Sequence, residues 1–212
     1  MRYSNCSIPE AIQHSKQGKL LIITDREDRE NEGDFFLPAA LITPEAVNFM
    51  ITYGKGLLCV PITSARAKLL NLPLMVSPNK NTESTGVNFT ISVNAAKGIS
   101  SGVSAFDRAL TIQRLASETA QSSDFTRPGH IFPLIAKDGG ILQRDGHTEA
   151  AIEMARLAGF PPVGVLCEII HSNGKMAKSL ELQRLAKQFD LKILAITDVI
   201  AYIKTHKSKK TF

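Results

Sequence analysis

The chain has 212 residues, of which 43% are apolar and 21% charged, and its formal net charge is +5. A chain of this size and composition can bury a real core, which excludes a disordered or fibrous protein. The positive charge favours anionic partners, phosphorylated metabolites included, but does not by itself distinguish them from nucleic acid.

Cysteine usage and hydropathy indicate the compartment. Cys6, Cys59 and Cys167 show no C-x-x-C spacing, so we expect neither a disulfide framework nor a zinc cluster. The first 18 residues contain no apolar signal-peptide core, and no apolar run is long enough to span a bilayer. These features predict a cytoplasmic protein that does not contact membranes.

Helical and strand patterns intermix along the first third of the chain. In order, we predict a helix from residue 8 that Gly18 ends, strands over 20–23 and 35–37, a helix over 43–53, a strand over 57–61 and a helix over 63–70. Residues 24–34, between the first two strands, read as a charged loop held on the edge of a sheet.

The same mixture continues to the C-terminal end. We predict an irregular loop over 71–86, an alternating strand over 87–93, a helix over 104–116, a polar loop over 117–128, strands over 131–136, 163–170 and 191–196, and helices over 149–158, 178–189 and 197–204. The period-two alternation of 87–93 is the strongest in the chain. Together the elements predict a mixed sheet layered with helices, an α+β fold.

The charged loop is the first candidate site. Glu30, Glu32 and Asp34 alternate, so an extended backbone would direct all three carboxylates to one side. Like charges this close repel unless a cation or a cationic substrate neutralises them. Carboxylates with open coordination positions suit magnesium, which often shares a phosphorylated ligand. The alternative interpretation is a solvated charged turn.

A second candidate site is the run from Arg144 to Thr148. The Arg144 guanidinium has the geometry to clamp a phosphate, and Gly146 allows close backbone approach. Thr148 stands where a helix N-cap belongs, and His147 can ligate a metal or hydrogen-bond a phosphate. The alternative is a capped helix with incidental charges.

Two further residues are candidates for acid–base chemistry. His130 follows a glycine beside a predicted strand, although a lone histidine is often structural. Glu168 lies in the middle of an apolar strand, where a carboxylate is costly to bury without a partner. It is either a partly desolvated general base or one half of a structural ion pair. The combined set suits a phosphorylated small molecule that undergoes proton transfers.

Five motifs in the same order resemble the 3,4-dihydroxy-2-butanone 4-phosphate synthase family, and the resemblance covers nearly the whole chain. They span residues 28–34 (DRENEGD), 101–108 (SGVSAFDR), 127–134 (RPGHIFPL), 144–150 (RDGHTEA) and 157–168 (LAGFPPVGVLCE). The resemblance implies a three-layer α/β/α arrangement around a mixed, twisted sheet. It also implies a homodimer with its sites close to the subunit interface.

The resemblance further implies a lyase that converts D-ribulose 5-phosphate to the four-carbon dihydroxybutanone phosphate and formate, in riboflavin biosynthesis. Its cofactor would be Mg²⁺, or Mn²⁺, with up to two ions per subunit. The residues that it assigns are metal ligands Glu30 and His147, acid–base residues His130 and Glu168, and substrate contacts Arg29, Glu30, Asp34, Arg144, Asp145, Gly146, His147, Thr148 and Glu168. Cys59 matches a cysteine near the substrate, which burial would explain equally well.

Two positions depart from the pattern of the family. Arg26 stands where an acid is common and adds a positive charge beside the metal loop, which we expect to weaken ion binding slightly. Asp145 fills a variable position and puts an anion beside the phosphate clamp. Many relatives carry a fused GTP cyclohydrolase II domain, whereas residues 1–212 are expected to form a single synthase domain.

Two other functions remain open from the sequence. The positive charge suggests a nucleotide- or RNA-binding module, but such a module needs a basic face with stacking aromatics, which the sequence lacks. A magnesium-dependent sugar-phosphate isomerase or phosphatase would use the same types of ligand. Product analysis separates these possibilities.

Overall fold

A computed structural model describes residues 6–207 as a seven-stranded mixed sheet with helices on both faces. The helices are α1 (Ile8–Lys16), α2 (Pro44–Phe49), α3 (Ser64–Leu69), α4 (Ala105–Ala116), α5 (His147–Leu157), α6 (Ser179–Phe189) and α7 (Ile196–Lys207). The strands are β1 (Leu21–Thr24), β2 (Gly33–Pro38), β3 (Lys55–Ile62), β4 (Val93–Ala95), β5 (Phe125–Ile135), β6 (Gly164–Ile169) and β7 (Lys192–Ala195).

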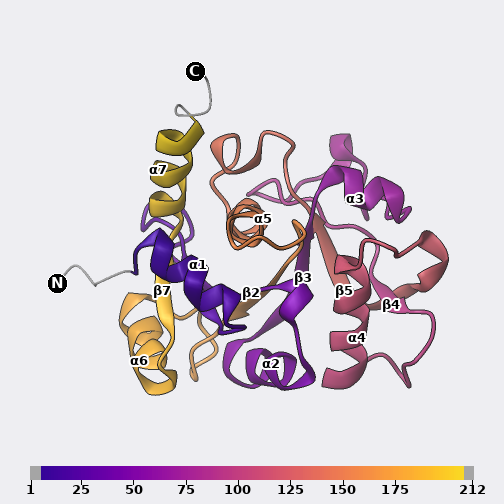
Figure 1. The fold of residues 1–212 in the computed structure, drawn as a ribbon, viewed down its shortest axis with the longest axis horizontal. Helices are drawn as coiled ribbons and strands as arrows, with labels where there is room; N and C mark the ends of the chain where they lie inside the picture. Colours follow the sequence, from indigo (N-terminus) through magenta and orange to yellow (C-terminus); the bar gives the residue numbers. More distant parts are fainter. Residues whose placement is uncertain (1–5, 208–212) are drawn as a thin grey trace.

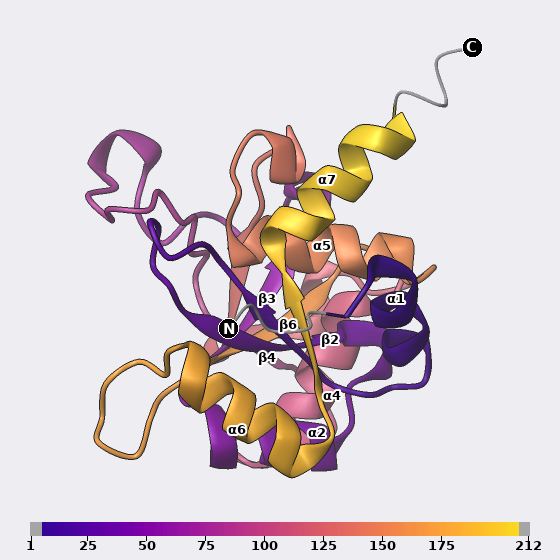
Figure 2. The same ribbon diagram turned by 90° about the vertical axis from the view of Figure 1, so that its left-hand side faces the viewer.

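The sheet order is β4-β5-β3-β6-β2-β1-β7 (Figure 1). The β1–β7 and β3–β5 pairs are parallel and the other pairs are antiparallel. Figure 2 shows α1, α5 and α7 on one face and α2, α4 and α6 on the other. The sheet is therefore mixed and lies between two helical layers, which confirms the α+β fold and the α/β/α layering.

Each face of the sheet buries its own apolar cluster. On the α5 face, Phe36 and Leu166 pack with Ala150 of α5. On the opposite face, Phe35 and Val60 pack with Ile112 of α4. Phe35 and Phe36 are both fully buried although they are neighbours, because side chains alternate across a strand and both faces are covered.

Local capping residues start several helices where the sequence places them. The side chains of Ser7, Thr43, Thr63 and Ser104 each accept a backbone N–H three residues later, at the starts of α1, α2, α3 and α4. These bonds satisfy amide donors that the first helical turn leaves unpaired.

The prediction of a strand over 87–93 is wrong. Residues 88–92 form only isolated bridges, and the regular strand begins at Val93. The amides of Thr90 and Ile91 donate to the carbonyls of Pro133 and Pro73. Because prolines have no N–H to return, a regular ladder cannot form on either side of this segment.

Three smaller expectations are also corrected. β5 starts at Phe125, within the predicted polar loop, because β4 and β3 flank it and supply partners. The charged loop joins two interior strands, β1 and β2, and does not lie at a sheet edge. The N-cap of α5 is Gly146, so Thr148 lies within the first helical turn.

No helix among residues 6–207 combines the length and the apolar content that crossing a membrane requires.

Candidate active site

A cleft of about 220 Å³ opens on the α5 face of the sheet. It is lined by Arg29, Glu30, Glu32, Asp34, Cys59, Glu83, Thr85, Val87, Phe89, Leu134, Arg144, His147, Thr148, Leu166 and Glu168. Figure 2 shows the β1–β2 loop and the loop of residues 71–92 projecting to the same side of the molecule. The cleft is smaller than pockets for drug-sized ligands, roughly 300–1,000 Å³, and so suits a compact molecule.

Asp25 organises the charged loop from within. Its Oδ1 accepts the Glu32 amide at 2.8 Å, and its Oδ2 accepts the Glu30 amide at 3.0 Å and Arg29 Nη1 at 2.9 Å. Burial opposes ionisation of Asp25, but these hydrogen bonds lower the pKa of its carboxyl below the usual value. The loop is therefore ordered by its own buried carboxylate, a role that the sequence analysis missed.

Glu30 and His147 meet across the cleft, as predicted. Glu30 Oε2 lies 3.9 Å from His147 Nδ1, although the residues are 117 positions apart in the chain. Burial lowers the pKa of His147, which favours the neutral ring that a metal ligand needs. His147 Nε2 is buried without a hydrogen-bond partner among the described residues.

These residues fit a divalent cation. Asp25, Glu30 and His147 each offer a ligand atom within 4.8 Å of the others. Both oxygens of Asp25 accept N–H groups, whereas Glu30 accepts only one among the described residues, at Oε2 from Arg29, so Glu30 and His147 are the better ligands. A hard cation that keeps several waters requires only a few protein ligands.

Asp34 and Glu168 are directly opposite each other on paired strands β2 and β6. Burial, then the negative charge of Asp34, raises the pKa of Glu168 to about 7. Burial, then the carboxylates of Glu30 and Glu32, raises the pKa of Asp34 well above its usual value. Two adjacent carboxyls that resist ionisation together can hold and release a proton near neutral pH.

Glu168 reaches the cleft past a bulge in β3. The pairing register shifts between Lys55 and Leu58, opposite Glu168. A Cβ on Gly56 would lie 2.5 Å from the Glu168 carbonyl oxygen and 2.6 Å from its Oε2. Only glycine leaves room for this carboxylate, and Oε2 is buried with no partner among residues 6–207.

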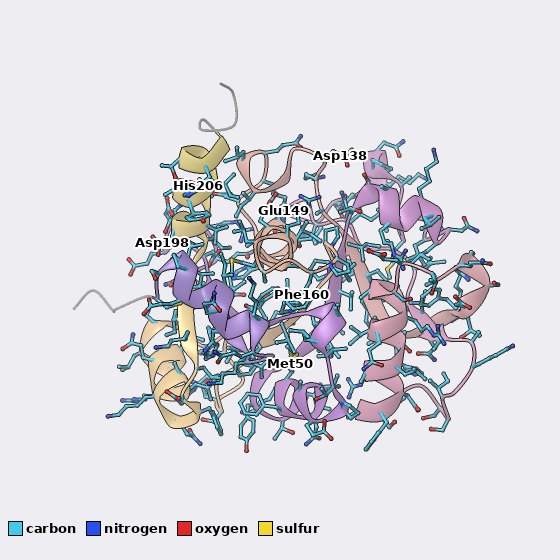
Figure 3. The ribbon with its side chains drawn as sticks, in the orientation of Figure 1. Met50, Asp138, Glu149, Phe160, Asp198 and His206 are labelled. Carbon is cyan, nitrogen blue, oxygen red and sulfur yellow. The ribbon has the colours of Figure 1, made fainter. Side chains whose placement is uncertain are left out.

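Arg144 lines the cleft, but protein partners hold most of its guanidinium. Nη1 donates to Glu149 Oε2 at 2.6 Å, while Nε and Nη2 donate to the carbonyl and hydroxyl oxygens of Thr85 at 3.0 and 3.2 Å. Glu149 projects from α5 in the middle of the molecule (Figure 3), and its side chain is 1% exposed. Three N–H groups of Arg144 are thus committed, which leaves two for a ligand.

The tip of the 71–92 loop is ordered by Glu83. Its carboxylate accepts the amides of Thr85 and Val87 and the hydroxyl of Thr85 at 2.8–3.0 Å. These bonds outweigh slight burial and lower the pKa of Glu83 to about 2. Glu83 and Thr85 line the cleft but did not emerge from the sequence analysis, which identified only a long irregular loop.

His130 does not line the cleft of its own chain. It is exposed on β5, where its amide donates to Asn94 Oδ1 at 2.8 Å and its Nδ1 lies 3.2 Å from Asn94 Nδ2. Glu168 and His130 are therefore not brought together around one cleft within the single chain.

The remaining predicted residues divide into two groups. Arg29 and Thr148 line the cleft, and Arg29 donates to Glu30 Oε2 at 2.5 Å. Asp145 does not line it, because its carboxylate turns to Arg26 at 2.5 Å. Gly146 is a close-approach position, since a Cβ there would lie 2.2 Å from Arg144 Nη1.

Cys59 is both a buried residue, 2% exposed, and a lining residue of the cleft. Burial, then the carboxylate of Glu168, raises the pKa of the Cys59 thiol well above its usual value. A raised pKa disfavours the thiolate, so Cys59 is poorly suited to act as a nucleophile.

Comparison with known proteins gives consistent results. The family model for 3,4-dihydroxy-2-butanone 4-phosphate synthase matches residues 9–202. Riboflavin biosynthesis protein RibBA of Bacillus mycoides strain KBAB4 is 52% identical over 204 residues, which are 96% of this chain and 51% of that protein. The chain thus spans about half the length of the curated relatives it matches.

Solved structures agree with the sequence relatives. A 3,4-dihydroxy-2-butanone 4-phosphate synthase in complex with two magnesium ions superposes with a TM-score of 0.91 at 38% identity, over 95% of this chain and 98% of that one. RibBX, a two-domain synthase from A. baumannii, gives a TM-score of 0.88 at 44% identity, over 93% of this chain and 57% of that one. With fold and sequence in agreement, this chain belongs to the 3,4-dihydroxy-2-butanone 4-phosphate synthase family.

Proposed function

We propose that the chain is a lyase that converts D-ribulose 5-phosphate to 3,4-dihydroxy-2-butanone 4-phosphate and formate, in riboflavin biosynthesis. The observation that carries the proposal is the convergence of Glu30, His147 and Glu168, from three distant segments, on one cleft in a member of this family. Residues 1–212 as a single synthase domain, and a cytoplasmic location, stay predictions.

Glu30 and His147 are proposed to hold Mg²⁺, or Mn²⁺, with room for up to two ions. Support comes from the 3.9 Å approach of their side chains, the unpartnered Nε2 of His147 and the excess of carboxylates around them. A related synthase binds two magnesium ions. When bound, the cation would supply Lewis-acid polarisation of adjacent substrate oxygens.

Glu168 is proposed to take the proton from C1 of the substrate, which gives an enediol before the carbon skeleton rearranges and C4 leaves as formate. A carboxylate with a pKa of about 7 is well matched to proton abstraction at neutral pH. Asp34 lies directly opposite Glu168 on β2. It can hold the proton that the Asp34–Glu168 pair keeps while Glu168 is ionised.

Arg29, Arg144, Gly146 and Thr148 are proposed to position the sugar phosphate. The two uncommitted N–H groups of Arg144 and the amides at the start of α5 are donors suited to a phosphate. The acidic lining of the rest of the cleft would repel a polynucleotide, which argues against the RNA-binding alternative.

His130 is proposed to serve the cleft of a second copy in a homodimer. Leu57, on β3 next to β5 in the sheet, has a surface that is 41% exposed. Val103 and Phe106 are 50% and 70% exposed, and Val103 follows Gly102, which abuts Asn94, the partner of His130. Exposed apolar side chains on neighbouring elements support an interface with a second copy.

The direct test is product analysis with D-ribulose 5-phosphate and Mg²⁺. We expect stoichiometric formate and the four-carbon phosphate, their loss in EDTA and their return with added Mg²⁺. Release of inorganic phosphate, or a five-carbon isomer as the sole product, would reject the synthase and favour the phosphatase or isomerase. Glu168→Gln serves as the inactive control.

A further inference from the structure

Arg26 and Asp145 join the two segments that carry Glu30 and His147. Arg26 Nη1 lies 2.5 Å from Asp145 Oδ2, a contact between residues 119 positions apart. Arg26 Nε also donates to Asp28 Oδ1 at 2.9 Å, so the guanidinium is oriented from both sides. Within the part of the chain that the structure describes, no other hydrogen bond links the loop of residues 25–32 to residues 143–148.

The Arg26–Asp145 contact lies close in sequence to both proposed metal ligands. Arg26 precedes Glu30 by four residues, and Asp145 precedes His147 by two. Asp25 already fixes the loop internally through the amides of Glu30 and Glu32. These internal bonds do not fix where the loop lies relative to the start of α5. The Arg26–Asp145 contact joins the loop to that part of the chain.

We propose that Arg26 and Asp145 are positioning residues that hold Glu30 at binding distance from His147 and thereby raise the affinity of the site for a divalent cation. This inference rests on the proposed function. It reverses the expectation that Arg26 weakens ion binding: Arg26 is already paired with two carboxylates, and its removal releases the loop from the start of α5.

The effect of Arg26→Ala on affinity separates positioning from simple charge. Electrostatics alone predicts that loss of a positive charge beside the site tightens cation binding. The positioning role predicts weaker binding, and Asp145→Ala should weaken it as well. The contact is partly exposed, at 46% and 36% for the two side chains, so the loss should be roughly two- to fivefold in Kd.

The experiment is a Mn²⁺ titration, followed by electron paramagnetic resonance, of wild type, Arg26→Ala, Asp145→Ala and the exchanged Arg26→Asp/Asp145→Arg double variant. We expect weaker binding in both single variants and recovery in the exchanged one, which restores the ion pair with its signs reversed. Arg156→Ala is the matched control, since Arg156 is an exposed, paired arginine at the other end of α5. Tighter or unchanged binding in Arg26→Ala, or no recovery on exchange, would overturn the inference.

A second measurement makes failure of the inference distinguishable from failure of the proposed function. Amide hydrogen exchange of residues 25–32 in metal-free protein requires neither cation nor substrate. Both single variants should accelerate it and the exchanged variant should restore it. Unchanged exchange would refute the positioning role even if wild type releases formate, whereas absence of Mn²⁺ binding in wild type would refute the proposed metal site instead.

Discussion

Glu168 lies in the cleft beside Asp34, and burial with that neighbouring charge raises its pKa to about 7. We predict that Glu168→Gln binds substrate with an affinity near that of wild type, since the side-chain shape is kept. Turnover should fall by about 10²–10⁴-fold, the usual contribution of a general base. Steady-state formate release and calorimetric binding of substrate measure the two effects, and wild-type turnover would exclude Glu168 as the base.

The raised pKa of Glu168 also determines how the free energy of unfolding of the metal-free protein depends on pH. The folded state raises the pKa of Glu168 from 4.5 to about 7, so the unfolded chain ionises this carboxyl more readily. Ionisation therefore lowers the free energy of unfolding as pH rises from about 4.5 to about 7. Glu168→Gln has no carboxyl to ionise at this position. Its free energy of unfolding should therefore exceed that of wild type by on the order of 1–3 kcal/mol at pH 8, and by little at pH 4. Denaturant unfolding at both pH values is the measurement, and an equal difference at the two would contradict the linkage.

At the scale of elements, the segment from Arg144 to Glu149 ties α5 to the loop of residues 71–92. Arg144 neutralises Glu149, whose side chain is 1% exposed, and holds Thr85 at the rim of the cleft. We predict that Arg144→Ala destabilises the protein by about 3–5 kcal/mol, because it leaves a buried charge unpaired. It should also accelerate amide exchange over residues 81–87.

Glu83→Gln is the comparison for this prediction. Glu83 orders the loop tip by accepting the amides of Thr85 and Val87 and, among residues 6–207, forms no hydrogen bond or ion pair with α5. Its loss should therefore accelerate exchange in the loop with little change in unfolding temperature. If Arg144→Ala left exchange over residues 81–87 at the wild-type rate, the proposed tie between loop and helix would be wrong.

The helices and the buried strands could be predicted because their signals are local. Ser7 and Thr43 cap helices through bonds that span three residues, and Gly18 follows the first helix as a left-handed position. The strand over 87–93 was mispredicted because its outcome depends on Pro73 and Pro133, which adjoin it only in the folded chain.

The candidate site was partly predictable for the same reason. Glu30 and Glu168 are identifiable because a crowded or buried carboxylate is costly, and His147 because it follows a glycine in the Arg144–Thr148 run; all three line the cleft. Asp25 and Glu83 act on nearby amides, and nothing in their sequence context separates them from ordinary loop acids. The ion pairs Arg144–Glu149 and Arg26–Asp145 could not be predicted from the sequence, because they depend on how the backbone turns at the start of α5.

At the scale of the whole molecule, the exposed position of His130 bears on assembly. If each cleft combines Glu168 of one chain with His130 of the other, then a dimer of His130→Ala with Glu168→Gln has one intact cleft. Mixing the two inactive variants under exchange conditions should then recover about a quarter of the wild-type sites, since half of the random dimers are mixed. Formate release against mixing ratio is the measurement, and no recovery despite exchange would place both groups in the same chain or remove the role of His130.

The claim on which the rest depends is that Glu30 and His147 grip one divalent cation between the β1–β2 loop and α5. Anomalous diffraction from crystals soaked in Mn²⁺ tests it most directly. We predict a peak within coordinating distance of the carboxylate of Glu30 and the imidazole of His147. A peak confined to other carboxylates, or none at a concentration that supports activity, would contradict it.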